Sequence, residues 1–295
     1  MASALNVTAL PEYVNEHKDE LLVKASAGAK TLDFVEIMGG VKFKDALNYL
    51  ESTAVLQDGS ACGFTPQGTD VFSQRYIEVV PVKVEKEFCW KDFRKTYANY
   101  LLNFEAGRET LPFEQKIAEA NMKAIQSELE TVIWQGGIDG IDGFVTLVQD
   151  EGGKTDIEEG ASATTIIDAL VADATSVMLK KGVNIFVSPT LFRQYVAEQN
   201  ANCCGNRVLI DAASDTLKYV GDSRITIIPV EGLEGASSAA IAATPDALVY
   251  GTDIEGADNV YRFWYDEKDD MMRMRVLFNA GTALKWPDET LATSL

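Results

Sequence analysis

Residues 111–134 read LPFEQKIAEANMKAIQSELETVIW and are followed, after Gln135, by GGIDGIDGF. Pro112 stands where a first-turn proline is tolerated, and the rest of the stretch has neither proline nor glycine. We predict a helix over 112–135, a rod of about 34 Å at 1.5 Å per residue. Three- and four-residue steps place one apolar side at Phe113, Ile117, Ala120, Ala124, Ser127, Leu129, Val132 and Ile133. Such a rod needs a sheet or another subunit to pack on.

The composition favours a folded protein with an acidic surface. The chain has 295 residues, 46% of them hydrophobic, and a formal net charge of −19. Proteins that bind nucleic acid without sequence preference need a surplus of Lys and Arg, which this chain lacks. Acidity instead favours solubility and repels DNA.

Metal and thiol chemistry has little support in the sequence. Cys62, Cys89, Cys203 and Cys204 form no C-x-x-C pair, and His17 is the single histidine. Nothing near Cys203 and Cys204 would activate a thiolate. We therefore predict no metal, no cofactor and reduced thiols.

The N-terminus and the hydropathy pattern predict no contact with a membrane. No basic and apolar signal segment opens the chain, so we expect no signal peptide. No apolar run approaches the roughly 18 residues of a membrane-spanning helix.

The candidate catalytic and metal-binding residues lack the neighbouring residues that such chemistry requires. His17 lies on the apolar side of a first helix without a nearby Ser or Cys pattern, so we interpret it as structural. Asp139 and Asp142 invite a calcium loop, but Asp150 stands where an EF-hand needs its closing Glu. We interpret the segment as a turn. We predict no catalytic residue and no enzyme.

The first third of the chain reads as an arm, a hairpin and a strand. Short helices are expected at 11–27 and 31–38, each closed by glycine. Residues 55–70 are a loop, 71–80 a strand with polar groups on both faces, and 82–90 an alternating, half-buried strand. Because the hairpin has no core of its own, we expect it to protrude and lie on a neighbour.

The remainder reads as an α/β unit and then a β-meander. One helix is expected from Thr164 to Lys181 with a capping box at Thr165 and Asp168, and another from Pro189 with Ser188 as its N-cap. Residues 259–265 should pair with 272–280. Met272, Met274, Val276 and Phe278 are expected on one face of the second strand, and Arg273, Arg275 and Leu277 on the other. For Arg273 and Arg275 we expect salt bridges, within or between subunits, to the acidic section 231–270.

In its order of elements the chain resembles the major capsid protein of tailed bacteriophages, the HK97-type fold. Four pieces carry the resemblance, QRYIEVVPVKVEKEF, FEQKIAEANMKAIQSELETVIWQGGIDGIDGF, VNIFVSPTLFRQYV with ITIIPVEG, and VYRFWYDEKDDMMRMRVLFNAGTALKWPDETL. The resemblance implies an α+β capsid fold with an N-terminal arm (1–50), an extended loop (51–81), a peripheral domain (82–140 and 258–295) with a spine helix at 112–135, and an axial domain (141–257).

The resemblance also implies a function and partners. We expect a structural protein that assembles in the bacterial host cytoplasm as pentamers and hexamers into an icosahedral or prolate shell around double-stranded DNA, which it does not bind specifically. Separate scaffolding, portal and decoration proteins are expected partners. Some members join subunits through a loop lysine, but residues 51–82 contain none, so we do not expect that bond here.

Two alternatives stay open. An encapsulin-type compartment shares the fold and the size, and would package an enzyme instead of DNA. A soluble acidic hydrolase or metal-dependent enzyme is the other alternative, and the single histidine and the failed metal spacing count against it.

Overall fold

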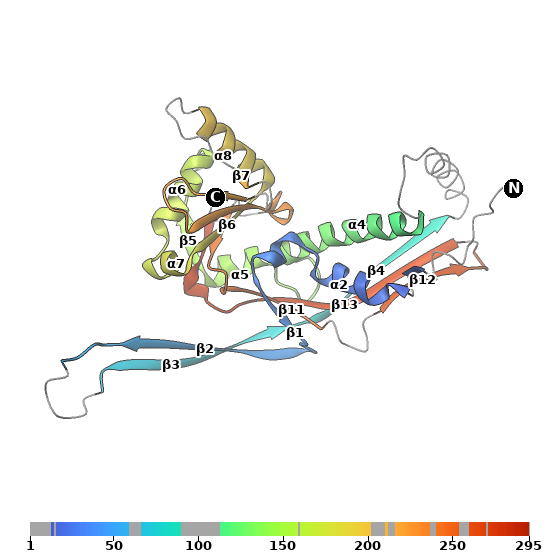
Figure 1. The fold of residues 1–295 in the computed structure, drawn as a ribbon, viewed down its shortest axis with the longest axis horizontal. Coiled ribbons are helices and arrows are strands. Elements are labelled where there is room, and N and C mark those ends of the chain that lie inside the picture. The colour runs from blue at the N-terminus through green and yellow to red at the C-terminus, as the bar shows by residue number, and fades with distance from the viewer. Residues whose placement is uncertain are drawn as a thin grey trace.

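The computed structural model describes residues 13–14, 16–58, 66–89, 113–158, 160–201, 210–211, 216–236, 240–253, 260–269 and 271–294. Its elements form two sheets, a long helix between them and a hairpin that leaves the body (Figure 1). The predictions that involve Cys62, Trp90, Pro112, Cys203 and Cys204 fall on positions outside the described residues.

The long helix α4 spans Phe113–Gln135, which confirms the helix predicted over 112–135. Its buried side agrees with the prediction at Leu129, Val132 and Ile133 and differs from it nearer the N-terminus. Ala120, Ala124 and Ser127 are exposed, and Ile117 is half-buried. The buried apolar side consists of Ala118, Met122, Ile125, Leu129, Val132 and Ile133. Small side chains bury little apolar area, so the larger ones at three- and four-residue steps decide which side turns inward.

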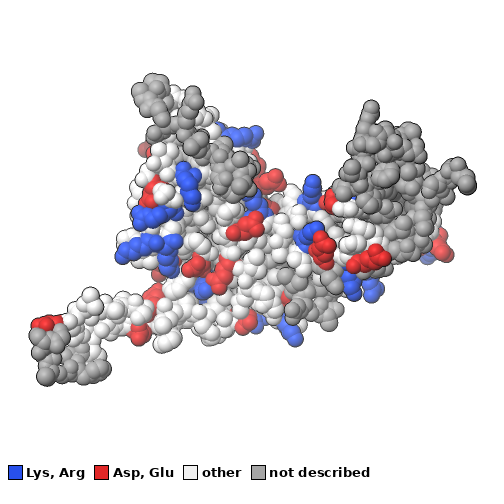
Figure 2. Space-filling view, in the orientation of Figure 1, with Lys and Arg blue, Asp and Glu red and all other residues white. Residues whose placement is uncertain are grey.

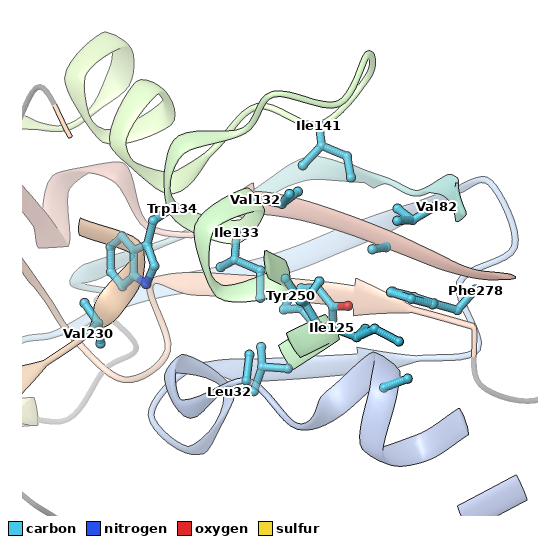
Figure 3. Packing of buried hydrophobic residues seen from close by; sticks show 14 of the residues in the cluster. Leu32, Val82, Ile125, Val132, Ile133, Trp134, Ile141, Val230, Tyr250 and Phe278 are labelled. Carbon is cyan, nitrogen blue, oxygen red and sulfur yellow. The ribbon is translucent and has the colours of Figure 1, made fainter. Parts of the chain in front are cut away.

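A five-stranded sheet lies along α4. Its order is β1 (Glu36–Gly39), β11 (Leu248–Thr252), β13 (Met271–Leu284) and β12 (Val260–Asp266), and β4 (Val80–Cys89) also pairs with β13. The pairing of β12 with β13 confirms the predicted C-terminal hairpin, with Tyr265 opposite Met272. Met272, Met274, Val276 and Phe278 share one face of β13 as predicted, and they are buried in one core with α4 and helix α2 (Lys18–Ala27) (Figure 3).

The helix expected at 31–38 is wrong. A 3-10 turn, η1, covers Lys30–Asp33, and residues 36–39 form β1, which pairs in parallel with β11. A helix this short is marginal without packing, whereas strand pairing satisfies the backbone groups of 36–39.

A seven-stranded sheet forms the other lobe. Its order is β5 (Gly153–Asp156), β14 (Thr290–Ser294), β10 (Ala240–Ala243), β6 (Val183–Val187), β9 (Ile225–Pro229), β8 (Thr216–Lys218) and β7 (Ile210–Asp211). Helices α5 (Phe144–Glu151), α6 (Ala163–Asp173), α7 (Ser176–Lys181) and α8 (Pro189–Ala201) accompany it, with 3-10 turns η2 (Glu231–Leu233) and η3 (Pro287–Glu289). Ser188 caps α8 as predicted, because its Oγ accepts a hydrogen bond from the Leu191 N–H at 3.2 Å.

The single helix expected from Thr164 to Lys181 is also wrong. Ala174 and Thr175 have extended backbone angles, and Thr175 caps a second helix by accepting from the Met178 N–H. Ser162, not Thr165, is the N-cap of α6. Threonine and serine hydroxyls compete for backbone N–H groups, and this favours a new helix start at Thr175.

Strand pairing joins segments that were expected from the sequence to lie in different regions. Strand β2 (Lys44–Ala54) spans the boundary at 50/51, β11 lies in the sheet of β13 although it falls within 141–257, and β14 lies in the seven-stranded sheet although it falls within 258–295. The sheet in which each strand lies is decided by its pairing with other strands. Short strands that are buried along their whole length, such as β11, lack the alternation of polar and apolar residues, so their sequence does not indicate which strand they pair with.

Candidate intersubunit surface

The hairpin of β2 and β3 (Gly68–Glu78) is the element that reaches furthest from the body (Figure 1). The two strands pair with each other in one antiparallel register from Lys44–Glu78 to Ala54–Gly68. They form a two-stranded sheet of their own. A protruding hairpin is therefore present, and its first strand, β2, covers residues for which the sequence predicted no strand.

The root of the hairpin is packed on the five-stranded sheet. Leu47, Ile77 and Val79 are buried and share a small core with Val249 and Ala283. The Val79 N–H also donates to the carbonyl oxygen of Phe43 at 2.8 Å, and this bond lies just beyond the last strand pair at the root of the hairpin. These contacts fix the direction in which the hairpin leaves the sheet.

Two glycines make room for this root. Gly251 of β11 stands opposite Gly281 of β13 in the sheet. A Cβ on Gly281 would lie 2.0 Å from the carbonyl oxygen of Glu78, and one on Gly251 would lie 2.7 Å from Cδ1 of Ile77. The strand from β3 into β4 crosses the sheet at a spot where only glycine leaves space.

Side chains connect the inner half of the hairpin to the other lobe. The Tyr49 ring packs on Trp286 in a tilted arrangement with ring centroids 4.5 Å apart, and Arg75 pairs with Glu151 of α5. The Lys181 ammonium lies 4.7 Å from the Trp286 ring centre and 2.6 Å from Oε1 of the buried Glu289. A continuous set of contacts thus runs from the hairpin to α7 and η3.

The outer half of the hairpin has no core. Phe72 is 81% exposed, Leu50, directly opposite, is 48% exposed, and Val55, Leu56 and Val71 are exposed too. Cross-strand polar bonds hold the ribbon, among them Ser52 Oγ to Asp70 Oδ1 at 2.5 Å. Uncharged atoms cover most of the described hairpin in Figure 2. An ordered ribbon with exposed apolar side chains is typical of a surface that another molecule covers.

The outer face of the five-stranded sheet is charged. Arg273 donates to Glu87 at 2.9 Å and to Asp269 at 2.7 Å, and also pairs with Asp266. Arg275 pairs with Glu85 at 2.7 Å. Arg273 therefore pairs as expected with Asp266 and Asp269 of the acidic section, and also with Glu87 of β4. The partner expected for Arg275 in that section is wrong, because β4 supplies Glu85 instead. The hydrogen bond to Glu87 raises the pKa of Arg273, and the bond to Lys83 lowers the pKa of Glu85.

A buried carboxylate holds the N-terminal segment to α4. Glu130 accepts from the N–H of Thr31 at 3.2 Å and from its hydroxyl. The Trp134 Nε1–H donates to the same hydroxyl oxygen at 2.6 Å. Burial raises the pKa of Glu130 above its ordinary value of 4.5, although the bonds from Thr31 oppose that shift.

The residues considered for chemistry take local structural roles. The Nδ1 of His17 lies 3.0 Å from the Tyr13 carbonyl oxygen, and the two rings stack. Asp139 lies within a tight turn closed by a bridge between Ile138 and Ile141, and Asp142 follows that turn. Among the described residues no group of three His, Cys, Asp or Glu side chains could hold a metal ion. No helix in the described part of the chain is long and apolar enough to cross a membrane.

Sequence reasoning missed the residues that position the hairpin and the arm. Thr31 and Glu130 are 99 positions apart, and Gly251 and Gly281 come from different strands. Glycines within alternating strands are a known signal of a close backbone approach, so Gly281 could have been singled out. Nothing local marks Glu130, which looks like any polar residue of an amphipathic helix.

Comparison with known proteins gives fold-level matches only. No protein-family model matches the sequence, and no curated protein matches it. A chain from the solved structure of Mycobacterium phage Adephagia is 14% identical, with a TM-score of 0.57 over 90% of this chain and 89% of that one. A chain of the satellite phage P4 procapsid including the size determination protein is 10% identical, with a TM-score of 0.59 over 100% and 92%. A virus-like particle from Pyrococcus furiosus gives 10% identity and 0.56 over 96% and 100%.

The chain has the HK97-type capsid fold. These three matches extend over 90% or more of the chain, so the HK97-type fold describes the hairpin, the long helix and both lobes together. The mixed α+β architecture predicted from the order of elements is thereby confirmed.

Proposed function

We propose that this chain is a major capsid protein that assembles as pentamers and hexamers into a closed icosahedral or prolate shell around phage double-stranded DNA. Its role is structural rather than catalytic, and its partners are other copies of itself. The shell forms in the cytoplasm of a bacterial host and is the capsid of the virion.

The observation that carries this proposal is the hairpin. A ribbon with a packed root and an uncovered apolar outer half gains stability when a neighbour covers that half, because burying apolar area contributes about 25 cal/mol per Å². The same neighbour contact repeated around a ring links every subunit to the next.

Within this proposal the domains follow the sheets. The N-terminal arm ends before β1, and β2 and β3 form the extended loop. The peripheral domain contains the spine helix α4 and the five-stranded sheet. The axial domain contains α5 to α8 and the seven-stranded sheet, to which the chain returns through β14.

The acidic composition suits an interior filled with DNA. With a net charge of −19, the shell wall does not hold phosphates by surplus positive charge. Scaffolding, portal and decoration proteins are further partners within this proposal.

A second candidate is an encapsulin-type shell that packages a protein. The similarity to the virus-like particle from Pyrococcus furiosus supports this second candidate, because the match extends over the whole of that chain. The two candidates share the assembly and differ in the contents.

The contents of purified particles distinguish the two. Particles from the native source should contain nuclease-protected double-stranded DNA, measured after external nuclease treatment and protein digestion. Particles that hold one stoichiometric second protein and no protected DNA would contradict the phage capsid and support the compartment.

A further inference from the structure

The outer face of β12 and β13 carries two arginines directly opposite each other. Arg262 pairs in register with Arg275, a like-charge arrangement that destabilises a strand pair unless an anion lies between them. Arg275 has Glu85 as its partner. No described residue forms an ion pair with Arg262, which is exposed.

An apolar pair stands next to these arginines on the same face. Val260 lies opposite Leu277, two residues from Arg262 and Arg275 along their strands, and Trp264 follows on the other side. Val260, Trp264 and Leu277 are half-buried, and together with both arginines and Phe263 they line a hollow of about 640 Å³. The face therefore presents an apolar pair and then a positive pair, about 7 Å apart along the strands.

The outer half of the hairpin presents the complementary order. Leu50 lies opposite Phe72, and two residues further out Ser52 lies opposite Asp70 on the same face. All four are exposed, and the Asp70 carboxylate faces no cation among the described residues. The hairpin thus presents an apolar pair and then a negative group, at the same spacing of about 7 Å.

We propose that in the assembled shell the hairpin of one copy lies face to face on the β12–β13 ribbon of a second copy, with Asp70 bound to Arg262 and Leu50 and Phe72 against Val260 and Leu277. Stacked β-ribbons lie about 10 Å apart, which the two sets of side chains fill. Turned end for end, the hairpin would bring Asn48 and Gln74 over the arginines and leave Asp70 unpaired, so charge selects one direction.

A nucleic-acid backbone fits this face less well than the hairpin of a second copy does. Glu85, Glu87, Asp266 and Asp269 surround Arg273 and Arg275 and would repel a row of phosphates. A single carboxylate beside an apolar pair matches a single unpaired guanidinium beside another apolar pair. The second copy is therefore the occupant that the face favours.

This contact rests on the proposed assembly. Exchanging the two charges tests the contact independently of the assembly itself. We expect Arg262→Glu and Asp70→Arg each to raise the subunit concentration needed for particle formation by roughly tenfold or more, because each sets like charges against one another. The double variant should recover most of the wild-type yield, measured by sedimentation and negative-stain microscopy. Lys268→Glu, which reverses an exposed charge at the turn of the same ribbon, is the control and should assemble normally.

Each other result overturns the inference. Single variants that assemble like wild type, or a double variant no better than the singles, would contradict the contact while leaving the capsid proposal intact. Normal particles with less DNA in Arg262→Glu would assign the arginine to phosphate instead. Wild-type protein that never forms particles would overturn the capsid proposal as well.

A cross-link reports on the same contact when a charge variant fails to fold. Phe72→Cys combined with Leu277→Cys should give disulfide-linked oligomers on a non-reducing gel of oxidised particles. Each single cysteine variant carries the same natural cysteines and should not. Equal ladders in the double and single variants would contradict the contact.

Discussion

Glu130 brings a negative charge into the contact between α4 and the N-terminal segment. Its two bonds from Thr31 keep the carboxylate in place, and Trp134 fixes the Thr31 hydroxyl from the other side. Burial is the largest influence on its pKa, and the nearby Glu231 raises it further. Because the pKa is raised in the folded chain, the folded state holds the Glu130 proton more tightly than the unfolded state does.

This proton linkage predicts a specific pH dependence. The stability that protonated Glu130 contributes is present below its unfolded pKa, near 4.5, and is lost as pH rises through the higher folded pKa. In the wild-type subunit the free energy of unfolding should therefore contain a component that falls with rising pH across that window.

Glu130→Gln should lack this component, as measured by urea unfolding of unassembled subunits at a series of pH values. Glu128→Gln removes a charge from the exposed side of α4 and is the control. Equal slopes in wild type and Glu130→Gln would show that Glu130 titrates alike in the folded and unfolded chains.

Gly281 sets the path of the hairpin root. Because an added Cβ would meet the backbone oxygen of Glu78, Gly281→Ala requires the strand itself to move. We expect a loss of about 1–3 kcal/mol in the free energy of unfolding and a lower yield of particles. Gly39→Ala, where nothing lies within 4 Å of the new methyl group, should change neither. A Gly281→Ala subunit as stable as Gly39→Ala would mean that the root adjusts freely.

At the scale of elements, α4 is the rigid part of the fold. One side of it is buried against the five-stranded sheet and α2, and its C-terminal end reaches η2 and the seven-stranded sheet through Trp134 (Figure 3). Phe186 of β6 lies 4.9 Å from Trp134 between ring centroids. The helix therefore joins the two lobes, and its straightness fixes their separation.

Ala124→Pro tests this role without removing a core side chain, because Ala124 is exposed. A proline in a helix interior costs about 3 kcal/mol and kinks the axis, so particles should not form. The measurement is particle yield by negative stain, and Ala124→Ser, which keeps the helix, should assemble normally. Normal particles from Ala124→Pro would mean that α4 does not fix the geometry of the shell.

Elements with a long local pattern could be predicted, and those that depend on distant partners could not. α4, α8 and the β12–β13 hairpin have extended periodic sequences or clear caps, and their positions agree with the structure to within a few residues. β1 was mistaken for a helix because its four residues acquire their conformation from β11, which is over 200 positions away. The same holds for the candidate site. That the hairpin protrudes could be predicted, because its sequence has polar residues on both faces and no core of its own. The positions of Gly251 and Gly281 beneath its root could not be predicted, because they depend on how the strands of the sheet pair.

At the scale of the whole molecule, the fold separates a packed body from an element that the body does not cover. Two cores fill the lobes and a third, smaller one fixes the hairpin root, while the outer hairpin remains exposed. In the proposed shell, other copies of the chain cover this exposed apolar ribbon. In the same proposal, the net charge of −19 opposes unspecific association of subunits before assembly.

Negative-stain electron microscopy of the purified full-length chain, over a range of protein concentration and ionic strength, is the most direct test of this account. We predict closed particles, or rings of five and six subunits where closure is incomplete. A chain that remains monomeric under all of these conditions, with its scaffolding protein supplied, would contradict the account.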